Sequence, residues 1–364
     1  MREILNCIER PVVVFSNGVN PLDDKPREGY QQRVAAVDSY LSPHYRVYIK
    51  INPNLRSGEN FRQLGLACLE IEIGPEPSSI IARLIQRAIA VYSHSIYPLL
   101  QTTARELVSL RHAPFIVDLH GVVPEEIAFL GDAPKAGIFA SLESWAVLEA
   151  DVLVHVTHQM ANHFIRKYPW LNNENIVCPI FTEPSHTEHR GRATHNAVVY
   201  AGGAQAWQQV DRIVDAVKES LQTYTTTILT HEPAVFREKF IAAGCPVDGK
   251  RISVYAARPA EVRSVYSKSN YGILCREAHI INKVACPTKL IEYLSFAVLP
   301  IMGTPQVGDF TDMGMCYATM EQFSASHLPT GIEYSEMVAN NFIVLQRLAE
   351  LANSGRKQLL AQLR

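Results

Sequence analysis

The chain has 364 residues and a formal net charge of −2, from 34 Lys and Arg against 36 Asp and Glu. This balance gives no electrostatic reason to expect a nucleic-acid partner, which would favour a strongly basic surface. Hydrophobic residues make up 47% of the chain and charged residues 19%, as in an ordinary soluble globular protein. The length favours two domains, each large enough to bury its own core.

The seven cysteines show neither a CxxC pair nor Cys/His spacing, so we expect reduced, mostly buried thiols in a cytoplasmic protein. The first residues, MREILNCIERPVVVF, contain acidic residues and no extended apolar core, so we do not expect them to form a signal peptide. No run approaches the roughly 20 apolar residues of a spanning helix. Any membrane contact would therefore be peripheral.

Short apolar runs alternate with amphipathic stretches through the first half of the chain, which predicts an α/β domain with a mostly parallel sheet. Residues 90–94 fit either the end of a helix over 79–92 or a separate short strand. The predicted strands are 11–15, 47–51, 67–73, 114–118 and 151–156. The predicted helices are 31–41, 79–92, 98–110, 140–150 and 157–168.

The pattern starts again after a polar stretch at 183–196 that has no apolar period and is typical of a linker. A strand over 197–201 runs into Gly202-Gly203 and then a helix over 208–221. This second Rossmann-like start indicates two similar domains, 1–182 and 195–335. A long helical segment, 336–364, has the apolar spacing of a helix that packs back toward the first domain.

The stretch from Tyr266 to Phe310 predicts a strand at 271–275, a polar loop, a helix after Pro287 and a strand at 298–302. Its loop and helix N-terminus lie at the carboxyl end of the first strand, where open α/β sheets bind ligands. Unpaired N–H groups at such a terminus favour a phosphate, with Lys289 one turn further along the helix.

The same stretch resembles the donor-binding region of glycosyltransferases of the two-Rossmann-domain type (GT-B), in particular family 4. Glu292-Tyr-Leu-Ser-Phe-Ala-Val-Leu-Pro-Ile is similar to the helix and strand whose Glu binds the ribose of a sugar nucleotide. The other Glu of that family, eight residues upstream, is Val284 here. The sequence instead is similar to a variant with Arg276, a loop and then Asn-x-Val-Ala-x-Pro-x-Lys. The donor contacts that this implies are Asn282, Pro287, Thr288 and Glu292.

Two segments of the first half also resemble this fold family. Asp118-Leu-His120-Gly121 ends a strand where family members carry a histidine that contacts the transferred sugar, which assigns that role to His120. Gly29-Tyr-Gln-Gln-Arg33 is similar to the glycine-bearing loop and helix that face the cleft, so Gly29 and Arg33 are expected on the acceptor side. Glu125 is either an acceptor-side group or a helix-start acid favoured by the dipole.

The second domain departs from the family at its phosphate site. The family follows the Gly with an Arg and a Lys, but residues 204–209 contain neither. We therefore expect the backbone of Gly202 and Gly203, with Lys289 and Arg276, to meet the diphosphate. Arg258 is a candidate near the base. With no Asp-x-Asp motif, we expect neither a metal nor another cofactor.

The resemblance implies α/β GT-B architecture, with a cleft between the domains, and a retaining transferase with His120, Arg276 and Lys289 as catalytic residues. It would move a sugar from a nucleoside-diphosphate sugar to a glycan or lipid-linked acceptor in surface-polysaccharide synthesis. The expected location is the cytoplasm, including the inner face of the cell membrane. A sugar-nucleotide epimerase and a non-catalytic nucleotide-binding protein remain alternatives. An oxidoreductase is disfavoured because neither domain has G-x-G-x-x-G after a strand.

Overall fold

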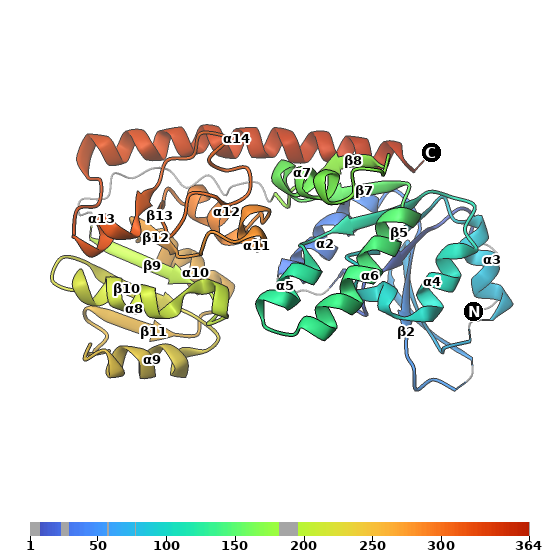
Figure 1. The fold of residues 1–364 in the computed structure, drawn as a ribbon, viewed down its shortest axis with the longest axis horizontal. Coiled ribbons are helices and arrows are strands. Elements are labelled where there is room, and N and C mark those ends of the chain that lie inside the picture. Colours follow the sequence, from blue (N-terminus) through green and yellow to red (C-terminus); the bar gives the residue numbers. More distant parts are fainter. Residues whose placement is uncertain (1–7, 23–28, 57, 77, 182–195, 364) are drawn as a thin grey trace. The chain divides into compact units, whose positions relative to one another are not determined.

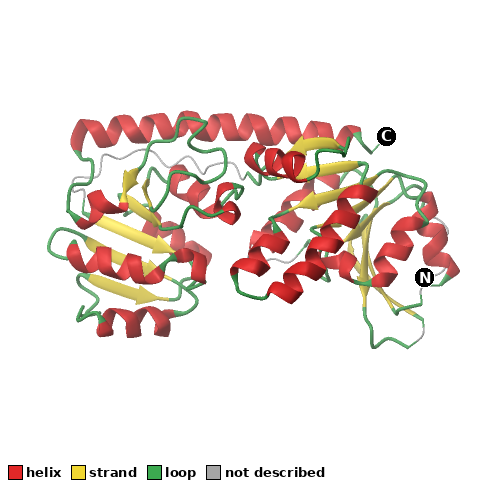
Figure 2. Cartoon of the chain, viewed as in Figure 1, coloured by secondary structure: helices red, strands yellow, loops and turns green. Residues whose placement is uncertain are grey.

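The computed structural model describes residues 8–22, 29–56, 58–76, 78–181 and 196–363. It separates into two compact units. Unit 1 contains Met1–Ile180 and Leu351–Arg364, and unit 2 contains Phe181–Glu350. Each unit is built on one mostly parallel sheet with helices on both faces (Figure 2), which confirms the predicted α/β class.

Unit 1 contains an eight-stranded sheet in the order β3-β4-β2-β1-β5-β6-β7-β8. Neighbouring strands are parallel except for β3 and β4, which are antiparallel. The strands are β1 Val12–Phe15, β2 Arg46–Ile51, β3 Glu59–Gly65, β4 Cys68–Ile73, β5 Ala90–His94, β6 Phe115–Leu119, β7 Val152–His155 and β8 Glu174–Val177. The α-helices are α2 Gly29–Leu41, α3 Ser79–Arg87, α4 Thr102–Ser109, α5 Val123–Phe129, α6 Ala133–Glu149 and α7 His158–Lys167, with a 3-10 turn η1 at Tyr97–Leu100.

Two details of unit 1 differ from the sequence expectation. The helix expected over 79–92 ends at Arg87, and residues 90–94 form β5, so the strand alternative is correct. Strand β3 was not predicted, because its sequence ENFRQLG is polar and its residues are exposed or half-buried at the edge of the sheet. An edge strand of this kind has no apolar run to mark it.

The topology of unit 1 creates one position where ligands are expected. Strand β1 pairs with β2 on one side and with β5 on the other, so the strand order reverses between β1 and β5. In open parallel sheets the crevice at the carboxyl ends of such strands is the usual binding site. The carboxyl end of β5 carries His94, and the adjacent strand β6 leads into His120.

Unit 2 contains a six-stranded sheet in the order β11-β10-β9-β12-β13-β14, with all neighbouring strands parallel. Its strand order reverses between β9 and β12, which therefore form the equivalent position. The strands are β9 Ala197–Ala201, β10 Thr225–Leu229, β11 Ile252–Tyr255, β12 Tyr271–Leu274, β13 Leu299–Met302 and β14 Ala318–Thr319. The α-helices are α8 Val210–Glu219, α9 Pro233–Ala242, α10 Pro259–Tyr266, α11 Ile280–Lys283, α12 Thr288–Ser295 and α13 Met320–Ser324.

The two-residue period of β9 explains how helices cover both faces of this sheet. Val198 and Tyr200 face the core that includes α8 and α9. Val199 and Ala201 face the opposite side, where they pack with Tyr266 of α10 and Tyr293 of α12. Successive side chains of a strand point to opposite faces of the sheet, so an almost wholly apolar strand is typical of a sheet that is buried on both faces.

The C-terminal segment forms one helix, α14 (Gly331–Ala361), drawn in red in Figure 1. Tyr334 belongs to the core of unit 2, whereas Leu359 belongs to the core of unit 1. A Cβ on Gly355 would lie 2.2 Å from the carbonyl oxygen of Val177, so this glycine allows the helix to approach the end of β8 closely. The C-terminal segment is therefore helical as predicted, but the helix begins at Gly331 and not at residue 336.

Across the described part of the chain, no helix combines the length and the apolar character that a membrane span requires.

Candidate active-site residues of the two units

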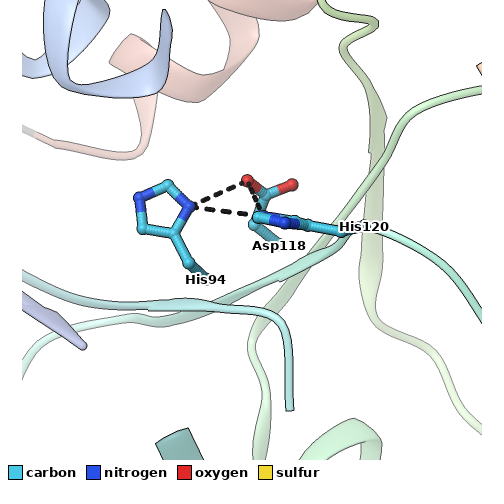
Figure 3. Close-up of side chains that lie close together, drawn as sticks. All are labelled: His94, Asp118 and His120. Carbon is cyan, nitrogen blue, oxygen red and sulfur yellow. Dashed lines mark hydrogen bonds and ion pairs between the residues drawn. The ribbon is translucent and has the colours of Figure 1, made fainter. Parts of the chain in front are cut away.

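The carboxyl ends of β5 and β6 in unit 1 bring two histidines and one carboxylate together (Figure 3). His94 Nδ1 lies 3.4 Å from Asp118 Oδ2, and His120 Nε2 lies 3.2 Å from the same oxygen. The two ring nitrogens are 3.3 Å apart. Register explains the contact, because His94 pairs with Asp118 across the two strands and His120 follows two residues later.

Arg33 of α2 neutralises this carboxylate. Its Nη2 donates to Asp118 Oδ1 at 2.8 Å, its Nε donates to Asp118 Oδ2 at 2.9 Å, and its Nη1 donates to the carbonyl oxygen of Cys178. Arg33 and Asp118 are both buried. Burial by itself would raise the pKa of Asp118, but the charge of Arg33 and the two histidines outweigh it and hold that pKa well below its usual range.

Tyr30 holds the cluster from the first turn of α2, three residues before Arg33 and so on the same face of the helix. Its hydroxyl donates to the carbonyl oxygen of His94 at 2.8 Å. Its ring lies 4.7 Å, centroid to centroid, from the ring of His120. The side chains of His94 and Asp118 are fully buried, whereas that of His120 is 13% exposed. Within the described structure, His120 is therefore the member of the three that is in part accessible from outside.

Burial lowers the pKa of His94 to about 4, although Asp118 opposes the shift. His94 is therefore neutral at physiological pH. The sequence expectation did not select His94. The available signal was its place at the end of a buried strand at the point of reversal, which only the strand order makes visible.

His94, Asp118 and His120 also meet a geometric condition for a metal site, since one ligand atom from each lies within 4.8 Å of the others. Asp118, however, already forms an ion pair with Arg33, so a divalent cation at this site would lie beside a buried guanidinium and be repelled by it. Among the described residues neither of the other ring nitrogens has a hydrogen-bond partner, unlike the supported histidines of most metal sites. These features disfavour a metal ion.

The structure gives different roles to the three residues expected on the acceptor side. Arg33 is inside unit 1 and does not face solvent. Glu125 accepts hydrogen bonds from His163 and Lys167 of α7, which lower its pKa to about 2 although burial would raise it. A Cβ on Gly29 would meet no atom within 4 Å, so no close approach requires glycine at this position.

Glu126 is the acid that lies against the turn after His120. A Cβ on Gly121 would come within 2.1 Å of Glu126 Oε1, so the glycine leaves room for this carboxylate. Burial raises the pKa of Glu126, and the charges of Glu125 and Glu143 act in the same direction. Glu126, and not the predicted acceptor-side residue Glu125, is therefore the acid that lies against the turn after His120.

In unit 2 the reversal point is marked by Arg276, which lies two residues after the end of β12. Within the described part of the chain, its guanidinium makes one long hydrogen bond, from Nη1 to Asn282 Oδ1 at 3.4 Å. Its Nε is buried and has no partner among the described residues, and no described carboxylate forms an ion pair with it. Burial lowers the pKa of Arg276 to about 10, which leaves the guanidinium charged at neutral pH.

Gly202 and Gly203 follow β9, the strand adjacent to β12, and so lie at the same edge of the sheet as Arg276. The hydroxyl of Tyr200 donates to the carbonyl oxygen of Gly203 at 2.6 Å. Burial raises the pKa of this phenol, and the positive charge of Arg276 opposes the rise. A Cβ on Gly203 would lie 2.6 Å from the side chain of Gln205. The glycine pair and Arg276 therefore follow adjacent strands at one edge of the sheet.

Lys289 and Glu292 contact each other on α12. Lys289 Nζ and Glu292 Oε2 are 3.0 Å apart, and the hydroxyl of Tyr266 donates to the same oxygen at 2.9 Å. Both side chains of the pair are about one-third exposed, so they remain accessible from outside. The predicted phosphate and ribose residues are therefore neighbours, with one carboxylate oxygen already occupied.

The remaining predicted donor residues differ in accessibility. Asn282 is buried, and its amide donates to the carbonyl oxygen of Glu277, so it holds the loop after β12. Pro287 precedes the first residue of α12, Thr288, and both lie at the helix N-terminus as expected. Arg258 is 85% exposed and pairs with Glu261. It follows β11, an edge strand separated from β12 by two strands, so it is not part of the group around Arg276.

Comparison with known proteins identifies the fold. No protein-family model and no curated protein match the sequence. The E. coli trehalose-6-phosphate structure bound with UDP-2-fluoro glucose is 12% identical, with 97% of this chain and 98% of that chain covered and a TM-score of 0.66. The UDP-forming alpha,alpha-trehalose-phosphate synthase of Burkholderia vietnamiensis is 14% identical, with 98% of this chain and 99% of that chain covered and a TM-score of 0.66. The sucrose-phosphate synthase of Thermosynechococcus elongatus is 11% identical, with 98% of this chain and 95% of that chain covered and a TM-score of 0.60. The chain therefore has the GT-B fold.

Proposed function

We propose that this chain is a glycosyltransferase that moves a sugar from a nucleoside-diphosphate sugar to a sugar-containing acceptor with retention of anomeric configuration. The observation that carries the proposal is Arg276, a charged and partly buried guanidinium with no acidic partner among the described residues. A partly buried positive charge costs free energy unless an anion pairs with it. A diphosphate is an anion of suitable size at this edge of the sheet.

The proposed chemistry needs little more than charge stabilisation. As the bond between sugar and diphosphate breaks, negative charge grows on the leaving group, and Arg276 with Lys289 would stabilise it without a metal. Backbone N–H groups around Gly202 and Gly203 would add to the same effect. Glu292, steadied by the hydroxyl of Tyr266, would accept hydrogen bonds from the ribose. His120 in unit 1 would contact the sugar itself.

The structural matches narrow the first donors and acceptors to test. One match is bound with UDP-2-fluoro glucose and another is named as UDP-forming, so UDP-sugars come first. Two matched enzymes are named after phosphorylated disaccharides, so hexose phosphates join glycan and lipid-linked acceptors in the panel. The proposal also includes four points that rest on the sequence resemblance. They are membership of the family 4 subgroup, a role in surface-polysaccharide synthesis, a cytoplasmic location and peripheral membrane contact.

Calorimetric titration with UDP, GDP, TDP and ADP would test the donor site. We expect one of them to bind the wild type and Arg276→Met to weaken its binding by about 10- to 100-fold, the loss for a hydrogen bond to a charged group. The matched control is Arg258→Met, which removes an exposed arginine of unit 2 and should leave the affinity unchanged. Equal affinity in Arg276→Met and the wild type would remove the basis of the proposal.

The alternatives differ in what they do to the donor. A transferase releases nucleoside diphosphate at a rate that depends on the acceptor. A sugar-nucleotide epimerase changes the sugar of the intact donor with no acceptor present, and a non-catalytic protein binds nucleotide without turnover. Product analysis by mass spectrometry and chromatography with the acceptor panel would separate the three.

A further inference from the structure

The cluster of unit 1 raises the question of where its hydrogens are. Three polar atoms face one another, His94 Nδ1, His120 Nε2 and Asp118 Oδ2, and their separations are 3.2, 3.3 and 3.4 Å. Asp118 is ionised because Arg33 binds both of its oxygens, so its Oδ2 can only accept. Every arrangement of hydrogens must therefore satisfy an acceptor at the centre of the group.

Among the arrangements in which both rings are neutral, one makes both histidine contacts with Asp118 favourable. If His94 carries its hydrogen on Nδ1 and His120 carries its hydrogen on Nε2, both N–H groups donate to the carboxylate. If either nitrogen is unprotonated, its lone pair faces the negative oxygen at 3.2 or 3.4 Å, which is repulsive. Adding a second hydrogen to His94 is also unfavourable, since its ring is fully buried beside Arg33.

We infer that Asp118, oriented by Arg33, is a positioning residue that holds His120 as the Nε2–H tautomer and His94 as the Nδ1–H tautomer. Tyr30 completes the arrangement by packing on the His120 ring while its hydroxyl binds the His94 carbonyl. The orientation and the hydrogen position of His120 are then set before any ligand arrives. This inference rests on the proposed function only in that His120 contacts the sugar.

The arrangement also fixes the state of the second nitrogen of His120. In the Nε2–H tautomer, Nδ1 carries the lone pair, and this atom is buried and has no hydrogen-bond partner among the described residues. The 13% of the side chain that is exposed therefore lies elsewhere on the ring, and Asp118 acts on His120 by setting the orientation in which the ring is presented.

Nuclear magnetic resonance on protein labelled with ¹⁵N-histidine tests the assignment directly, without any substrate. Long-range ¹⁵N–¹H spectra distinguish the tautomers, and the signals that disappear in His120→Gln and His94→Asn identify the two rings. We expect His120 to be protonated at Nε2 and His94 at Nδ1 at pH 7. The opposite tautomer for either ring, or a doubly protonated ring, would overturn the inference, as would one equivalent of tightly bound metal by elemental analysis.

Asp118→Asn links the tautomer to the reaction. The amide removes the negative charge, so His120 should become a mixture of tautomers. We expect kcat to fall by about 10- to 100-fold with KM for the donor changed less than about threefold, since an ill-positioned group costs rate more than binding. His112→Gln, which changes an exposed histidine, should alter neither value. An Asp118→Asn protein that folds and keeps kcat would overturn the positioning role.

The two experiments fail in different ways. If Asp118→Asn does not fold, the wild-type tautomers still decide the inference. If the wild type shows the expected tautomers but transfers no sugar to any acceptor, the proposed function fails while the hydrogen arrangement of the cluster stands.

Discussion

The two units place an arginine near the same kind of topological position and use it in opposite ways. In unit 1, Arg33 is buried with Asp118 and its charge is balanced inside the protein. In unit 2, Arg276 follows the strand at the reversal point and meets no described carboxylate. An arginine that is paired internally holds the fold together, whereas one left unpaired at a ligand-binding edge indicates an anionic ligand. Residue type alone does not distinguish the two cases.

Removing each arginine in turn should give the largest contrast. Arg33→Met leaves Asp118 buried without its cation, which should lower the free energy of unfolding by about 3–5 kcal/mol. Arg276→Met removes a charge that has no internal partner, so we expect a loss below about 1 kcal/mol or a gain. Urea denaturation of both variants at pH 7.5, without ligand, measures the difference. Comparable losses in the two variants would show that Arg276 has an internal partner after all.

Acid should destabilise unit 1, because this unit contains buried histidines that are neutral. We expect the loss of unfolding free energy from each histidine to be smaller than the loss in Arg33→Met. Burial lowers the pKa of both His94 and His155 to about 4, against about 6.5 in the unfolded chain. Between those pH values the unfolded state binds more protons, so stability falls as the pH is lowered. Each histidine should cost about 2 kcal/mol at pH 5 relative to pH 7.5.

The acid effect is measured by urea denaturation of the wild type at both pH values, with His155→Phe as the comparison. This variant keeps an aromatic ring and removes one titrating group, so its loss between pH 7.5 and pH 5 should be smaller by about 2 kcal/mol. An equal loss in both proteins would mean that His155 does not remain neutral in the folded state.

Lys289 should show the smallest effect on nucleotide binding. It is about one-third exposed and already paired with Glu292, so a ligand phosphate must compete with that carboxylate for it. We expect Lys289→Met to weaken diphosphate binding by less than about tenfold, clearly less than Arg276→Met. Calorimetry on both variants gives the ranking, and a larger loss for Lys289→Met would make α12 rather than Arg276 the main phosphate contact.

Local signals explain which parts of the site were predictable. The strand end at Asp118-Leu-His120 and the loop after β12 are each contained in a few consecutive residues, where an apolar run meets polar residues. Positions at strand ends could therefore be chosen from the sequence. The sequence did not show which of two adjacent helical residues lies against the turn after His120, as Glu125 and Glu126 show, because such residues point in directions about 100° apart.

Local periodicity was sufficient for the α/β class, for the second Rossmann-like start at residue 197 and for the C-terminal helix, because each depends on spacing within one segment. The pairing of charges was decided only by the tertiary structure. Arg33 and Asp118 are 85 residues apart, and no spacing rule connects them. Burial and neighbours, not residue identity, determine whether a charged side chain supports the fold or awaits a ligand, and both arise only when distant strands align in one sheet.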